Sequence, residues 1–135
     1  MILFVLLAAG SLLGATTVGA ERCKLCHRSV YQSWAATPHA NRAPSAFEER
    51  CLLCHATGKA RLPAVQCEAC HGPGSDYSPP EVMIDPEKAE MAGLVRPSLV
   101  VCERCHENDE PGHRGEVVMP ERNEWTRWIH EVKNP

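Results

Sequence analysis

The feature that most constrains this chain is a pentapeptide that occurs four times. Each copy has two cysteines separated by two residues, with a histidine directly after the second cysteine. The copies read CKLCH at 23–27, CLLCH at 51–55, CEACH at 67–71 and CERCH at 102–106. Two thiols three residues apart lie on one side of a helical turn, where they can add to the two vinyl groups of one porphyrin. The next residue, histidine, then reaches the iron as its proximal ligand. The pattern is typical of c-type haem attachment and predicts four covalently bound haem c groups.

This interpretation gives twelve residues a role in the cofactor sites. Thioether bonds are predicted at Cys23, Cys26, Cys51, Cys54, Cys67, Cys70, Cys102 and Cys105. Proximal iron ligands are predicted at His27, His55, His71 and His106. The same cysteine pairs could instead hold zinc, form redox-active disulfides or belong to a disulfide scaffold. None of these alternatives requires a histidine after every second cysteine, so haem attachment is favoured.

The composition leaves little apolar material for an ordinary core. The chain has 135 residues, which is the length of one domain, and its aromatic content is 5%. Such a chain needs a metal, disulfides or a large cofactor to complete its interior. We therefore expect a mainly α fold with much irregular structure, a small multihaem c-type cytochrome in which the haems form the core. The net charge of −3 gives no basic footprint, so nucleic acid is not an expected partner.

Residues 1–20 differ from the rest of the chain because they contain no charged residue. The run ends Val18-Gly19-Ala20, which puts small residues at the positions that a signal peptidase recognises and predicts a cut before Glu21. No Lys or Arg precedes the apolar run, which is long enough to span a bilayer, so a retained membrane anchor is the alternative. Both versions predict a tetrahaem domain at 21–135 that is exported to the periplasm or to the outer face of the cytoplasmic membrane.

The pattern of apolar and helix-ending residues predicts short helices. We expect a helix over 24–37 that Pro38 stops, and a non-helical loop at 72–80. Asp85 and Pro86 predict the start of a short helix that Gly93 closes. Pro97-Ser98 should start the helix of the fourth motif, and a C-terminal helix is expected at 119–133. No stretch alternates as a strand should.

Three histidines remain after the four proximal ligands: His39, His113 and His130. Each is a candidate distal ligand, because a six-coordinate haem needs a second axial group. Within one chain, at most three of the four irons can then have two histidine ligands. The alternatives are a surface-loop role for His39, a solvated role for His113 in its polar loop, and a position of His130 away from the apolar face of its helix. Axial histidines on both sides give a lower potential than histidine with methionine.

Three segments resemble those of a known family. The first, CKLCHRSVYQSWAATPHANRA, is similar to CxxCHxxxYxxWxxSxHAxA, and VQCEACHGPGSDY is similar to CExCHGPGSxH. The tail WIH resembles an Ile-His ending that follows the last haem motif. Together, with four CxxCH motifs in order, they resemble the tetrahaem cytochrome c-554 family. The resemblance implies the fold and the haem ligation of that family, with distal ligands at His39 and His130.

The chain departs from the family pattern after its GPGS sequence. The family takes a further distal ligand from a histidine at that point, whereas Asp76 and Tyr77 stand there in this sequence. Either His113 replaces that ligand or one haem lacks a second histidine. Met119 is another candidate for the sixth ligand, beside Met83 and Met91, and Tyr77 is a weaker one. Without such a ligand, one haem is five-coordinate.

Electron transfer is the function that these features favour. Haems pass one electron at a time, and the sequence holds no obvious catalytic constellation, so we do not expect an enzyme. The expected partners are redox proteins that act as donor and acceptor. Two alternatives stay open. One is an enzyme that acts on small nitrogen compounds at an open haem. The other is a subunit of an extracellular cytochrome filament, an oligomer in which a neighbouring chain supplies a distal histidine.

Overall fold

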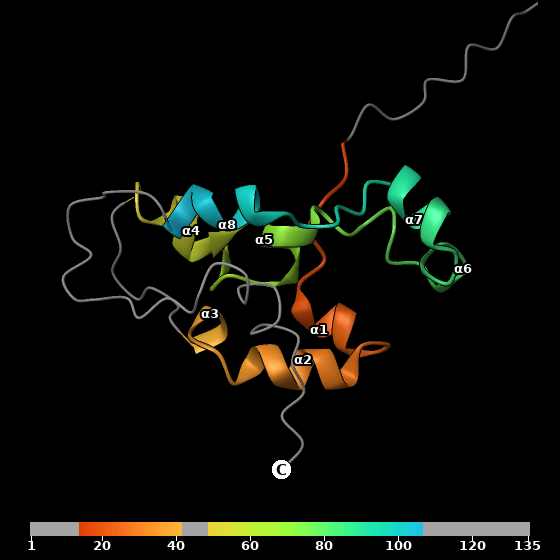
Figure 1. The fold of residues 1–135 in the computed structure, drawn as a ribbon, viewed down its shortest axis with the longest axis horizontal. Helices are drawn as coiled ribbons and strands as arrows, with labels where there is room; N and C mark the ends of the chain where they lie inside the picture. Colours follow the sequence, from red (N-terminus) through yellow and green to blue (C-terminus); the bar gives the residue numbers. More distant parts are fainter. Residues whose placement is uncertain (1–13, 42–48, 107–135) are drawn as a thin grey trace, which may run out of the picture.

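The structure is a computed structural model that describes residues 14–41 and 49–106 (Figure 1). Short helices joined by irregular segments make up most of this part of the chain, together with one pair of two-residue strands. The elements are α1 (Ala20–Lys24), α2 (Arg28–Ala35), α3 (Pro38–Asn41), α4 (Leu52–His55), β1 (Ala56–Thr57), β2 (Leu62–Pro63), α5 (Cys67–His71), α6 (Pro80–Met83), α7 (Pro86–Met91) and α8 (Leu99–His106). The predicted mainly α fold with much irregular structure is confirmed.

The single helix predicted over 24–37 is wrong, because the last residue of one helix and the whole of a second lie in this region. α1 ends at Lys24 and α2 begins at Arg28. Between them, His27 leaves the helical region of backbone space, with φ −108° and ψ 50°. Pro38 does not only end a helix. It is the first residue of α3, a position where its missing N–H costs nothing.

The predicted start of α7 and the predicted loop at 72–80 agree with the structure, except that the last residue of that loop, Pro80, begins α6. Residues 72–79 contain no helix, and α6 starts at Pro80. The Asp85 carboxylate accepts a hydrogen bond from the Lys88 N–H at 3.2 Å, as expected of an N-cap. Gly93 follows α7 with φ +101°, which glycine adopts without steric cost. The C-terminal helix expected at 119–133 lies outside the described residues.

The strands were not expected from the sequence. They pair antiparallel, with Ala56 opposite Pro63 and Thr57 opposite Leu62. Thr57 is almost fully buried and holds the end of this hairpin in place. Its hydroxyl donates to the Ala64 carbonyl at 2.8 Å and accepts from the Gln66 N–H at 2.8 Å. The hairpin thereby delivers the chain to the start of α5.

Residues 64–78, called here the central segment, connect most parts of the described fold. The Trp34 Nε1–H donates to the Val65 carbonyl at 2.8 Å, and the Val65 N–H donates to the His39 carbonyl at 3.0 Å. These bonds join α2 and α3 to the residues that precede α5. On the other side, the Arg104 side chain of α8 donates to the Ala69 carbonyl. Figure 1 shows α5 between α1 and α2 on one side and α4 and α8 on the other.

Few apolar side chains of the described residues are buried. The buried hydrophobic residues are Ala20, Ala64, Tyr77 and Ala89, whereas the exposed large ones include Leu25, Leu53, Ile84, Met91, Val95 and Val100. Three of the four buried residues are alanines, which bring little apolar area to a core. An interior built from haems suits this arrangement, and the haem core stays a prediction.

Replacing Trp34 by Phe is expected to lower the free energy of unfolding of the haem-loaded protein by about 1–3 kcal/mol, because the Val65 carbonyl loses its partly buried donor. Guanidinium unfolding followed by far-ultraviolet circular dichroism measures the change. Tyr31→Phe is the matched control, since its hydroxyl meets Glu21 at an exposed position on the same helix. Equal stability of the two variants would contradict the role given to the indole N–H.

Candidate haem sites

Each CxxCH motif forms a helical turn, as its chemistry requires. In the first motif, the N–H groups of Cys26 and His27 donate to the Cys23 carbonyl at 3.2 and 2.9 Å. The second motif repeats these two bonds on the Cys51 carbonyl, at the same two distances. The third motif is the whole of α5, and the fourth forms the end of α8. All four turns place the two cysteines of a pair on one side, with the histidine next in line.

The first motif lies against the third, and the second against the fourth. A side-chain hydrogen bond between Cys23 and Cys67 lowers the pKa of the Cys23 thiol and raises that of the Cys67 thiol. Burial raises the pKa of the Cys105 thiol to about 12, and a side-chain hydrogen bond with Cys54 adds to the increase. Thiols that interact in this way are close neighbours, although the two pairs are far apart in sequence.

A third contact joins these two pairs of motifs. The Arg104 side chain donates to the Ala69 carbonyl at 3.2 Å. Ala69 belongs to the third motif and Arg104 to the fourth. Burial raises the pKa of the Cys70 thiol, and the charge of Cys102 raises it further. The four motifs therefore form a connected series in the order first, third, fourth, second. Sequence analysis could not find this order, because no local spacing reports which motifs meet.

The histidine of the third motif is oriented by a backbone carbonyl. His71 Nδ1 lies 2.9 Å from the Val95 carbonyl oxygen. A carbonyl can only accept, so this contact places the ring proton on Nδ1 and makes Nε2 the nitrogen that would bind iron. Histidines that bind metals are commonly oriented in this way by a second group. Val95 was missed in the sequence because a backbone carbonyl leaves no signature in residue type.

His39 lies against the histidine of the fourth motif. The ring centres of His39 and His106 are 5.8 Å apart, and the ring planes make an angle of 73°. Imidazole nitrogens bind metals at about 2 Å, so two rings on opposite sides of one ion have centres about 6 Å apart. Burial, followed by the nearby His106, lowers the pKa of His39. The separation therefore fits two imidazoles on either side of one iron.

Of the remaining candidates for axial ligands, only some lie within the described residues. His113, His130 and Met119 lie outside the described residues. Tyr77 is buried, and its hydroxyl donates to the Gly72 carbonyl at 2.6 Å. Burial is also the main reason why the pKa of this phenol is raised. Because the hydroxyl closes its own loop, Tyr77 acts here as a structural residue rather than as a ligand.

The donor set of these motifs matches the requirements of a c-type haem. Within 14–41 and 49–106, all eight cysteines are free thiols, and no three His, Cys, Asp or Glu side chains gather around a common point to hold a metal ion. The thiols instead lie in pairs on helical turns, each pair followed by a histidine. Paired thiols that can bond one porphyrin, with an imidazole for its iron, are the groups that this cofactor needs.

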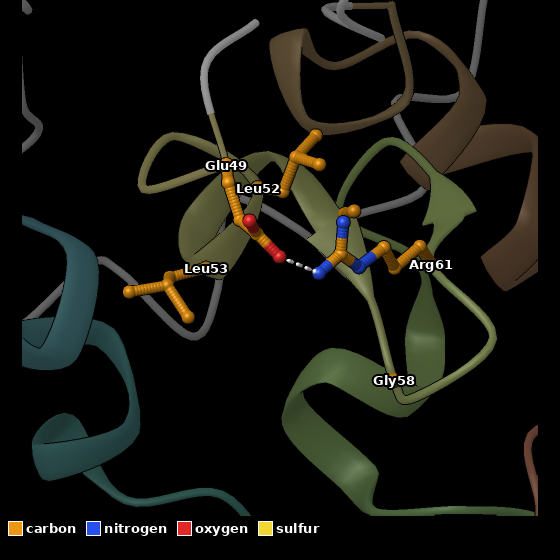
Figure 2. A pocket seen from close by; sticks show the side chains of 6 residues that line it. Glu49, Leu52, Leu53, Gly58 and Arg61 are labelled. Atoms are coloured by element: carbon orange, nitrogen blue, oxygen red, sulfur yellow. Dashed lines mark hydrogen bonds and ion pairs between the residues drawn. The ribbon is translucent and has the colours of Figure 1, made fainter.

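A pocket of about 350 Å³ lies beside the second motif (Figure 2). Leu52 and Leu53, the two residues between Cys51 and Cys54, form part of its wall. An ion pair between Glu49 and Arg61 crosses it, and the hydrogen bond and charge of Arg61 lower the pKa of the Glu49 carboxyl. Arg61, the cation among the described residues of this wall, is therefore already paired.

Comparison with known proteins links the start of the domain to one family. Residues 22–50 match the family described as cytochrome c554 and c-prime. The predicted resemblance to cytochrome c-554 is confirmed. The match includes the first CxxCH motif and His39, and it ends next to Cys51. No solved structure matches the chain.

One relative in the cytochrome c-554 family extends the likeness. Cytochrome c-554 of Nitrosomonas europaea is 28% identical over 92 residues, an alignment that covers 44% of this chain and 39% of that protein. The chain thus matches about two fifths of the length of that relative. Among the described residues, no helix is long and apolar enough to cross a membrane.

Proposed function

We propose that this chain is an electron-transfer protein that carries four haem c groups, one on each CxxCH turn. The observation that supports this most is the connected series of the four motifs. Haems bonded to adjoining turns would lie next to one another, so an electron that enters at one motif could move along the series to the last. A cytochrome c-554 likeness at the first motif is in keeping with a c-type cytochrome.

The residues of this chain supply attachment, orientation and ligation. When bound, each haem supplies an iron that gains or loses one electron without any change in covalent bonds to a substrate. The cysteine pairs fix the distance between neighbouring haems. The contact of His71 with the Val95 carbonyl fixes the direction of one imidazole. The protein thereby controls both the path and the potentials of transfer.

The fourth motif offers the clearest axial pair. We infer that His39 and His106 would both hold the iron of one haem, since their ring centres are 5.8 Å apart. The Val65 N–H donates to the His39 carbonyl at 3.0 Å and holds α3 in position. Two imidazoles give this haem a lower potential than a histidine and a methionine would. Under this proposal, the last haem in sequence takes its second ligand from a helix near the N-terminus.

The setting proposed for this activity is outside the cytoplasm, in the periplasm or at the outer face of the cytoplasmic membrane. The covalent haem motifs and the uncharged run at 1–20 support it. The partners are a donor protein and an acceptor protein that exchange single electrons with the outermost haems. By the order of the motifs, these are the haems of the first and second CxxCH turns.

The haem content is the direct test. The intact mass of the exported protein should equal that of the polypeptide plus four haems, and the haems should stay bound in acid acetone. Replacing both Cys102 and Cys105 by Ala should reduce the count to three, because the fourth porphyrin loses its thioether bonds. Bound zinc without porphyrin would overturn the proposed function.

A further inference from the structure

Residues 16–20, called here the N-terminal strap, are built into the described domain. Thr16 and Ser75 form two hydrogen bonds: the Thr16 N–H donates to the Ser75 hydroxyl at 2.9 Å, and the Ser75 N–H donates to the Thr16 carbonyl at 3.0 Å. At the other end, the Ala20 N–H donates to the Gln66 side chain at 2.7 Å, and Ala20 is buried. The strap thus runs along the central segment and contacts it at both ends.

Glu68 holds the middle of the strap with a buried carboxylate. Its side chain accepts from the Val18 N–H at 2.8 Å, the Gly19 N–H at 2.7 Å and the Gly74 N–H at 2.7 Å. Glu68 is only 5% exposed. A buried carboxylate is tolerated only where hydrogen bonds replace water. Two of the three donors that do so here belong to the strap.

Two glycines of the domain leave room for strap side chains. A Cβ on Gly58 would lie 2.3 Å from Thr17 Cγ2. A Cβ on Gly74 would lie 3.0 Å from Val18 Cγ2 and 2.9 Å from a carboxylate oxygen of Glu68. The central part of the fold is therefore shaped around the strap, independently of the hydrogen bonds. This fit is the packing of an internal segment.

The strap leads directly into the first haem motif. The Gly19 carbonyl accepts from the Arg22 N–H at 3.0 Å and starts α1, which carries Cys23. Glu68, in turn, is the residue after Cys67, whose thiol meets that of Cys23. One carboxylate thereby ties the segment before the first motif to the turn of the third.

We propose that residues 16–20 are a permanent part of the haem domain, and that Glu68 is a positioning residue that sets the first haem motif against the third. A cut before Glu21 would remove Val18 and Gly19, which are two of the three donors to the buried Glu68 carboxylate. It would also remove Ala20, the first residue of α1. The mature chain therefore begins at Thr16 or earlier. The positioning role rests on the proposed haem function, whereas the start of the chain does not.

The first test is the N-terminus of the exported, haem-loaded protein, read by intact mass and N-terminal sequencing. A chain that starts at Thr16 or upstream is expected. A chain that starts at Glu21 would overturn the proposal. The same mass spectrum counts the haems separately, so failure of the haem assignment is distinguishable from failure of the strap.

A second test uses the contact between the strap and Gly58. Gly58→Ala should lower the thermal midpoint of the full chain, because its φ of +67° and the Thr17 methyl both oppose a Cβ. Adding Thr17→Ala should recover part of that loss, whereas Thr17→Ala alone should change the midpoint much less. If the second substitution gives no recovery, Thr17 does not lie against Gly58 in the mature protein and the proposal fails.

A third test separates positioning from general stability. In Glu68→Gln, hydrogen exchange at the Val18 and Gly19 amides should speed up, and the potentials of two of the four haems should shift while the other two hold. Glu87→Gln is the matched control, because Glu87 lies exposed on α7 and is not one of the residues that hold the strap. Unchanged hydrogen exchange in Glu68→Gln would show that Glu68 does not hold the strap. An equal shift of all four potentials would contradict the positioning role.

Discussion

Replacing His39 by Ala is expected to convert one haem in four from low spin to high spin and to raise its reduction potential. Under the proposed ligation, His39 and His106 share one iron, and their ring centres are 5.8 Å apart. Removal of one imidazole leaves that iron with a single axial histidine, which lowers the ligand field and favours the reduced state. Low-temperature electron paramagnetic resonance counts the spin states, and a potentiometric titration follows the potential.

Two controls make this result specific to the imidazole. Free imidazole added to the His39→Ala protein should restore the low-spin signal, because it can occupy the position of the missing ring. Gln32→Ala, at an exposed site on α2, should not change the spin state of any haem relative to the parent protein. A His39→Ala spectrum identical to that of the parent would show that the contact with His106 does not hold an iron. His130→Ala is expected to act in the same way on a different haem.

The parts of the site that follow from local chemistry could be predicted from the sequence. Cysteines at i and i+3 share a face in any helical turn, and each of the four motifs forms one. The start of α7 was likewise set by neighbours, with Asp85 as the N-cap and Pro86 at the first position. Such features depend on residues a few positions apart, where side-chain type decides the backbone.

The parts set by tertiary contact could not be predicted. The helix expected over 24–37 is interrupted because the haem turn ends at His27 with a non-helical backbone. The pair of strands at 56–57 and 62–63 is too short to show alternation, and its geometry depends on the buried hydroxyl of Thr57. The contact of Cys23 with Cys67 joins residues far apart in the chain. No periodicity encodes such a contact.

The strap shows why one sequence pattern can support two interpretations. Gly19 and Ala20 are small, which is what a signal peptidase recognises. Small residues are also what a closely packed segment needs, and here Gly19 has φ +85° while Ala20 is buried. The residue types are the same in both cases. Only the partners of the strap, above all Glu68, favour the second interpretation.

Carbon monoxide is expected to bind about one haem in four when the unmodified protein is reduced. Three histidines cannot serve as distal ligands for four irons, and Tyr77 is engaged with the Gly72 carbonyl. A five-coordinate ferrous haem has an open position where carbon monoxide binds. Titration of the reduced protein, with the total haem taken from its pyridine haemochrome, gives the bound fraction.

The His39→Ala variant links the two predictions. It should raise the bound fraction from about one haem in four to about two in four, because the iron at His106 then has an open face. A bound fraction of zero in the parent protein would mean that every iron has six ligands, with the last supplied by a methionine or by a neighbouring chain. Dilution separates these two sources. A ligand from a neighbouring chain is lost as the protein is diluted, so carbon monoxide binding would then appear. A methionine of the same chain, such as Met119, would keep the haem closed at every concentration.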